Sequence, residues 1–161
     1  MALNASALSR SQAERIENVE DELIALSKAF LNLQTEYNYH LEDLHKVKPD
    51  ESSKYTAAFM TDKVYDRAKS GASAKRKIKE LEKWESNLLT CFKAILKPYN
   101  EHLKYFHEVQ PILLDVQYVE PSDTLSKEER IQGIESNAVR LSNFMPRLQE
   151  AYNSHVKMLH Y

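Results

Sequence analysis

The sequence has little glycine and cysteine, and it contains no long hydrophobic run. Its two glycines, against an ordinary share of about 7%, argue against a fold rich in strands and turns. Its one cysteine, Cys91, excludes an internal disulfide framework and agrees with a reducing compartment. No segment resembles a membrane span, which needs roughly 18 apolar residues, or a secretion signal. We therefore expect one helix-rich, cytoplasmic domain, either a whole chain or an excised part of one.

Charge of one sign is not in excess either. The formal net charge of −2 gives no overall attraction for nucleic acid or for an anionic membrane. Its distribution is uneven, because residues 54–83 carry nine basic and four acidic side chains, a net +5. The densest part of this stretch runs through Lys75, Arg76, Lys77 and Lys79.

What the chain does contain is an apolar seam with heptad spacing. Steps of three and four residues alternate along the first and last thirds of the chain. Such spacing keeps one face of a helix on a neighbouring helix for many turns, so it predicts long helices packed at shallow angles. The seam positions are Ile16, Val19, Leu23, Leu26, Phe30, Leu33 and Tyr37 in the first stretch, and Ile131, Ile134, Ala138, Leu141, Met145, Leu148, Tyr152, His155 and Leu159 in the last.

Capping residues and prolines set the expected helix ends. Ser11 with Glu14, and Ser126 with Glu129, have the spacing of capping boxes. The expected helices cover residues 11–47, 53–118 and 126–160, with an alternative break of the middle one near Gly71. Proline removes an amide and clashes with the preceding turn, so we expect kinks at Pro98, Pro111 and Pro146.

These expectations combine into one all-α domain over residues 1–161. We predict an antiparallel, up-down-up bundle of three long helices with coiled-coil-like packing, or of four if Gly71 divides the middle segment. The bundle is expected to be elongated, with a homodimer as an alternative to the monomer.

The six histidines are candidate metal ligands. They form three pairs with members five residues apart: His40 and His45, His102 and His107, and His155 and His160. That spacing separates two side chains by about 140° on an α-helix, which is poor for chelation. Glu42 with His45 is the one Glu-x-x-His element, whereas di-iron bundles use two. We therefore expect solvated or seam-edge histidines, no metal site and no cofactor.

Catalytic motifs are absent from the sequence. It has no glycine-rich phosphate loop, no Gly-x-Ser-x-Gly and no paired Cys-x-x-Cys. These absences argue against nucleophilic, phosphoryl-transfer and thiol-redox enzymes, so we expect a non-enzymatic protein and name no catalytic residue.

The preferred function is a protein-interaction or scaffolding module that binds a partner protein through a helix-lined surface. Aromatic residues often supply most of the affinity at such surfaces. The expected contact residues are Trp84, Tyr99, Tyr105, Phe106 and Leu114.

A second hypothesis is a membrane-surface or phosphoinositide-binding module of the BAR-like type, by analogy of architecture alone. Long helices bent by prolines would form a crescent, and Lys75, Arg76, Lys77 and Lys79 would meet anionic lipid or an acidic partner. Near-neutral charge counts against it, and nucleic acid is disfavoured because no aromatic platform accompanies the basic residues. A metal-dependent helical enzyme is the third hypothesis.

Overall fold

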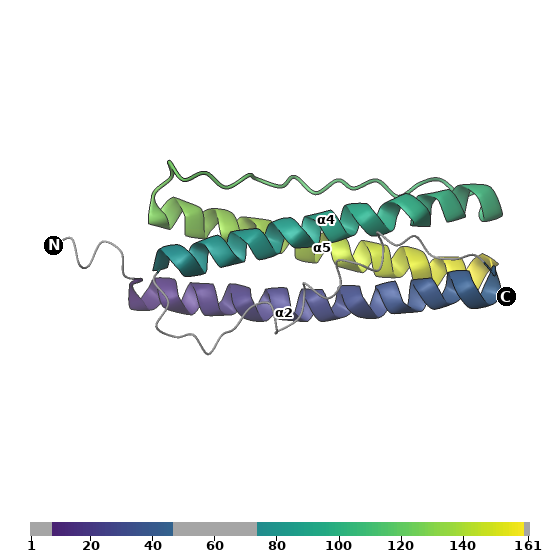
Figure 1. Ribbon diagram of the computed structural model, residues 1–161, viewed down its shortest axis with the longest axis horizontal. Coiled ribbons are helices and arrows are strands. Elements are labelled where there is room, and N and C mark those ends of the chain that lie inside the picture. The colour runs from purple at the N-terminus through teal and green to yellow at the C-terminus, as the bar shows by residue number, and fades with distance from the viewer. Residues whose placement is uncertain (1–7, 47–73, 160–161) are drawn as a thin grey trace.

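The computed structural model describes residues 8–46 and 74–159, which form three long helices and one short π-helix. Helix α2 spans Arg10–Tyr39 and continues into the π-helix η1, His40–Leu44. Helix α4 spans Ala74–His107, and helix α5 spans Lys127–Leu159. The predicted all-α class and helical bundle are confirmed, since the described residues contain no strand and the three helices pack side by side (Figure 1).

Capping boxes begin two of the helices. The α5 box is the predicted one, in which Ser126 and Glu129 each accept a hydrogen bond at 3.1 Å from the other's backbone amide. The α2 box lies two residues before the predicted one: Ser9 Oγ accepts from the amide of Gln12, and Gln12 Oε1 accepts from the amide of Ser9. Gln12 can take the role predicted for Glu14, because glutamine, like glutamate, has a side-chain oxygen that reaches back to the amide of the N-cap residue.

All three helices run in the same direction, so the predicted antiparallel order is wrong. Near their starts, Arg15 of α2 pairs with Glu128 of α5 at 2.5 Å, and Arg130 of α5 pairs with Glu82 of α4. Near their ends, His155 of α5 lies against His40 and His102. A heptad seam carries no direction, since it presents one apolar face whichever way the helix runs. The direction of each helix therefore depends on the length of the segments that connect the helices.

The connection between α4 and α5 is a long extended segment, residues 108–126, that runs back along the outside of the bundle (Figure 1). Its 19 residues can span about 60 Å, more than the roughly 50 Å length of α4. The prediction that the middle helix continues to residue 118 is wrong, because α4 ends at His107. Glu108 has the left-handed φ of 55°, and the amide of Val109 donates to the carbonyl of Leu103.

Two asparagine side chains hold the extended segment to the helices. Asn100 of α4 donates to the carbonyl of Ile112 and accepts from its amide, at 3.0 and 2.7 Å. Asn137 of α5 makes the same pair of bonds with Val119, at 2.8 and 3.0 Å. Each side-chain amide thus forms hydrogen bonds with both the backbone N–H and the backbone carbonyl of one residue in the segment, as a neighbouring β-strand would. Between these clamps, the partly buried Ile112, Leu114, Val116 and Tyr118 alternate with exposed residues.

The prolines inside the helices do not end them. Helix α4 continues through Pro98 and α5 continues through Pro146, while Pro111 lies in the extended segment. Bends at Pro98 and Pro146 stay predictions. The proposed kink at Pro111 is wrong, because no helix remains there to bend. Gly71 lies outside the described residues.

The core is built in layers that take one residue from each helix. The predicted seam residues of α2 are all buried, as are those of α5 from Ile131 to His155. Phe92 lies between Phe30 and Phe144, with ring centroids 5.7 and 5.2 Å apart. The next aromatic layer holds Tyr37, Tyr99 and Tyr152. The ring centroid of Tyr37 lies 4.6 Å from that of Tyr99 and 6.4 Å from that of Tyr152. Aromatic pairs of this kind contribute about 0.5–1.5 kcal/mol beyond the area that they bury.

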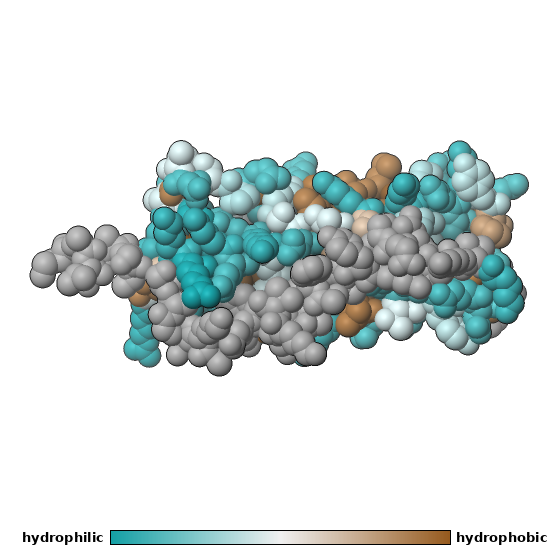
Figure 2. Space-filling model, viewed as in Figure 1, coloured by the Kyte–Doolittle hydropathy of each residue, from teal (hydrophilic) through white to brown (hydrophobic). Residues whose placement is uncertain are grey.

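The visible outer surface is mainly hydrophilic, with scattered hydrophobic residues (Figure 2). Within the described ranges, no helix combines the length and the apolar character needed to cross a membrane.

Candidate metal centre

Five histidines meet at the end of the bundle where the three helices terminate. His40 and His45 come from η1 and the residue that follows it, His102 and His107 from the last turns of α4, and His155 from α5. One ring nitrogen of each lies within 4.8 Å of the corresponding atom in all the others. Because the helices are parallel, residues near three carboxyl-terminal ends become neighbours. This finding corrects the expectation of solvated or seam-edge histidines.

These histidines belong to a repeat in the sequence that the seam analysis did not detect. The pattern Tyr-Asn-x-His-x-x-x-x-His begins at Tyr37, Tyr99 and Tyr152. Its first position forms the tyrosine layer, and its fourth forms the next layer of the bundle. The last histidine of the third copy, His160, lies outside the described residues. A repeat of this kind was the signal that could have predicted the cluster.

The five-residue spacing, which argued against chelation, is accommodated by the local backbone. Residues His40–Leu44 form a π-helix, whose wider turn brings residues five apart onto one side. Nε2 of His45 consequently lies 3.1 Å from Nε2 of His40. His107 is the last residue of α4 and lies at the same distance from His102. Ideal α-helical angles do not describe these two pairs, because one spans the π-helix and the other ends at the last residue of α4.

The centre of the cluster is a triangle of Nε2 atoms, one from each helix. The three sides measure 3.2 Å between His40 and His102, 3.2 Å between His102 and His155, and 2.9 Å between His155 and His40. All three side chains are buried, with at most 4% of their surface exposed. We call these three residues the inner histidines, and His45 and His107, which are half-buried, the outer histidines.

Hydrogen bonding alone cannot satisfy the triangle of inner histidines. An imidazole nitrogen either bears a hydrogen and donates, or has a lone pair and accepts. Three nitrogens in mutual contact cannot alternate between these two roles. In every choice of tautomers, at least one side of the triangle therefore places two lone pairs, or two N–H groups, against each other. A cation at the centre removes the conflict, since it binds all the lone pairs at once.

The surroundings keep the ring of His102 neutral, which is the form that binds metal. Burial, followed by the neighbouring His45, His155, His40 and His107, lowers the pKa of His102 to about 2. The tyrosine layer lies between the cluster and the rest of the core: the ring of Tyr37 is 6.4 Å from that of His40 and 6.0 Å from that of His102. Burial is also the largest cause raising the pKa of Tyr37, so its hydroxyl stays protonated, and it donates to the carbonyl of Pro98.

The donor set favours a particular class of ion. All the described members of the cluster are histidines. Neutral imidazole suits zinc, copper, nickel, cobalt and iron, whereas calcium and magnesium prefer oxygen ligands. Converging rings from three helices also form a site that exists only in the folded chain, so an ion bound there would stabilise the fold.

The predicted partner-contact residues are scattered rather than gathered at one surface. Trp84 and Tyr99 are 5% and 1% exposed, and the indole of Trp84 donates to Ser27 Oγ inside the bundle. The bundle itself thus uses most of the surface of both side chains, and contact with a partner through either residue stays a prediction. Tyr105 and Phe106 are 72% and 52% exposed at the end of α4. Leu114 lies on the extended segment, where it is partly buried against the core.

The basic cluster lies on the first turns of α4. Lys75, Arg76 and Lys79 are exposed, and Lys77 is partly buried. Arg76 pairs with Glu80 one turn later, at 3.2 Å. Binding of lipid or of an acidic partner by these residues stays a prediction.

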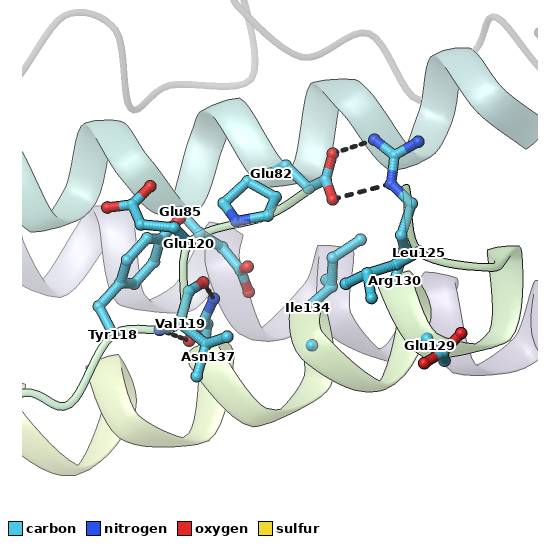
Figure 3. Close-up of a pocket in the computed structure, with 12 residues that line it drawn as sticks. Glu82, Glu85, Tyr118, Val119, Glu120, Leu125, Glu129, Arg130, Ile134 and Asn137 are labelled. Atoms are coloured by element: carbon cyan, nitrogen blue, oxygen red, sulfur yellow. Dashed lines mark hydrogen bonds and ion pairs between the residues drawn. The ribbon is translucent and has the colours of Figure 1, made fainter. Parts of the chain in front are cut away.

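A separate small cavity lies near the other end of the bundle, between α4, α5 and the extended segment (Figure 3). Its volume is about 20 Å³, room for a single water. On one side Arg130 binds both carboxylate oxygens of Glu82. On another lie Tyr118 and the buried Glu85, neither of whose side chains has a hydrogen-bond partner among the described residues.

The Glu85 carboxyl is protonated at neutral pH. Burial, and then the charges of Glu82 and of Glu22 on α2, raise its pKa to about 9. Arg130, which lines the same cavity, is engaged by Glu82 and Asp123. The fold therefore carries a buried carboxylic acid that would be charged in the unfolded chain.

Comparison with known proteins gives no identification: no family model, no curated protein and no solved structure matches the chain.

Glu85 makes the stability of the fold depend on pH. Between about pH 4.5 and pH 9 the unfolded chain loses this proton while the folded chain keeps it. The free energy of unfolding should therefore fall as pH rises through this window, by up to about 1.4 kcal/mol per pH unit. The variant Glu85→Gln removes the ionisable group, and we expect it to exceed the wild type by about 1–3 kcal/mol at pH 8 but not at pH 5. Urea unfolding at both pH values measures this difference.

The matched control is Glu120→Gln, which changes an exposed carboxyl that lines the same cavity. It should leave the pH dependence unaltered. Equal pH dependence in Glu85→Gln and in the wild type would contradict the assignment of a buried, protonated carboxyl.

Proposed function

We propose that this protein binds a transition-metal ion through its histidine cluster, and that the ion fastens together the ends of three parallel helices. The observation that supports the proposal is the triangle of inner histidines, with Nε2 separations of 2.9–3.2 Å. Each helix contributes one ring, and hydrogen bonds cannot satisfy the three contacts in any tautomer. A divalent cation is the ligand that resolves this arrangement.

The distances themselves fit a metal site. A first-row ion bonded to imidazole nitrogen at about 2.1 Å places neighbouring ligand atoms roughly 3.0–3.4 Å apart. The inner histidines fall in or just below this range, so little movement is needed to bind an ion. Preformed geometry of this kind supports high affinity, because few side chains have to be ordered on binding.

The proposal replaces the expectation that the chain has no metal site, and it assigns the ion a structural role. No catalytic residue is proposed. The ion would contribute to folding stability by mass action, about 2.7 kcal/mol when its free concentration is a hundred times the dissociation constant.

A role in binding protein partners is the second candidate, supported by exposed apolar side chains at the end of α4 and on the extended segment that follows it. Tyr105 and Leu113 are each 72% exposed, and Phe106 is 52% exposed. We expect these residues to meet a second copy of the chain. The wild type should then show a concentration-dependent rise in mass by light scattering, and Tyr105→Ser with Leu113→Ser should reduce it. A wild type that remains monomeric at all concentrations would contradict this second candidate.

Metal binding is tested by calorimetric titration of chelator-treated protein with Ni²⁺ and with Zn²⁺. We expect one ion per chain for the wild type and at least about a tenfold loss of affinity for His102→Ala, since even supporting groups around a metal are worth that much. His45→Ala, at the half-buried edge of the cluster, gives a second variant if His102→Ala unfolds.

The matched control is Glu42→Gln, which changes the exposed carboxylate three residues before His45. It should bind the ion as the wild type does, because the donors are imidazoles. A wild type that takes up neither ion would refute the metal proposal, as would a His102→Ala variant that folds and binds with unchanged affinity.

A further inference from the structure

The number and placement of the donors in the histidine cluster carry more information than the presence of a metal site. We infer that the cluster holds its ion in an octahedral, six-coordinate arrangement, as Ni²⁺ and Co²⁺ readily adopt, rather than in the tetrahedral arrangement of a structural zinc site. This inference rests on the proposed function. It adds the class of ion that the site selects.

The first argument is the number of rings. Structural zinc sites are almost always four-coordinate, whereas the described cluster already brings five imidazole nitrogens within 4.8 Å of one another. A tetrahedral ion bound to the three inner histidines would use only one further ligand. At least one outer histidine would then be left beside a metal-bound ring with which it cannot form a hydrogen bond, because the lone pair of that ring is already occupied.

The second argument is distance. Around an ion at about 2.1 Å, ligands at right angles lie roughly 3.0 Å apart, tetrahedral ligands roughly 3.4 Å apart, and opposite octahedral ligands roughly 4.2 Å apart. The observed contacts between neighbouring rings are 2.9, 3.1, 3.1, 3.2 and 3.2 Å. All five lie below the tetrahedral value and within about 0.2 Å of the octahedral one.

The third argument is the arrangement of the rings in two tiers. The inner histidines contribute one nitrogen from each helix and form one triangular face. His45 and His107 lie five residues further along their helices, each in contact with the inner histidine of its own pair. An octahedron consists of two such opposed triangular faces, so the second face holds these two rings and one further nitrogen or oxygen donor.

The outer histidines are held in place rather than left to move freely. The ring of His45 packs against Phe106 at 4.9 Å and against His102 at 4.3 Å. The ring of His107 lies 4.2 Å from that of His155. Each is followed by a residue in the left-handed conformation, Lys46 with φ 56° and Glu108 with φ 55°. Matching backbone at two helix ends indicates that both rings are positioned by the fold.

Selectivity follows from this geometry. Nitrogen sites generally bind Ni²⁺ more tightly than Co²⁺. Zinc prefers four ligands, so a six-coordinate site does not suit it. The site is therefore expected to discriminate in favour of Ni²⁺ over Zn²⁺.

The visible absorption of Co²⁺ tests the geometry, because octahedral Co²⁺ absorbs weakly and tetrahedral Co²⁺ absorbs intensely. Chelator-treated wild type is loaded with one equivalent of Co²⁺, and binding is measured separately by equilibrium dialysis. We expect bound cobalt with the weak octahedral spectrum. In the double variant His45→Ala, His107→Ala, only the three inner histidines of the described cluster remain, and absorbance per bound ion should rise on the order of tenfold as the ion becomes four-coordinate.

The control is Glu42→Gln, which should retain the wild-type spectrum, and circular dichroism checks that each variant keeps its helices. Intense absorption from the cobalt-loaded wild type would overturn the octahedral inference and leave metal binding intact. If the wild type bound none of the three ions Co²⁺, Ni²⁺ and Zn²⁺ in equilibrium dialysis, the proposed function itself would be refuted. The wild-type spectrum decides the geometry even if the double variant does not fold.

Discussion

The common direction of the three helices is the constraint on which the rest of the structure depends. Parallel helices place residues of equivalent position at the same height, so phenylalanine packs with phenylalanine, tyrosine with tyrosine and histidine with histidine. If one helix were reversed, its histidines would lie at the opposite end of the bundle, roughly 50 Å away. The cluster is thus a consequence of topology as much as of residue type.

Parallel order requires long connections, and the segment 108–126 provides one. It returns along the bundle in extended form, held by the side-chain amides of Asn100 and Asn137. At the helix starts, Arg15 and Arg130 bind carboxylates of neighbouring helices, which fixes the register of one helix against the next. The ion pairs at one end of the bundle and the histidines at the other therefore align the same three helices.

Much of the fold could be predicted from the sequence, because heptad spacing and capping boxes act locally. The seams of α2 and α5 are buried where their spacing placed them, and the box of Ser126 and Glu129 begins α5. Direction could not be predicted from the seam. The helix end at His107 was missed because apolar residues continue beyond it. Their spacing of two from Ile112 to Tyr118, typical of an extended chain, was the available signal.

The candidate site was missed because each histidine pair was judged on a single ideal α-helix. Ligands converge in space from several helices. One described pair spans the π-helix, and the other ends at the last residue of α4, just before Glu108 leaves helical geometry. Comparing the three Tyr-Asn-x-His sequences would have predicted one layer of histidines. It would not have predicted Glu85, whose buried position depends on how the extended segment covers α4.

The most direct test of the account is a crystal structure of the protein grown with Co²⁺, with diffraction recorded on both sides of the cobalt absorption edge. The account predicts three parallel helices and one strong anomalous peak between the Nε2 atoms of His40, His102 and His155. An antiparallel bundle, or a cobalt-bound protein without a peak at that position, would contradict it.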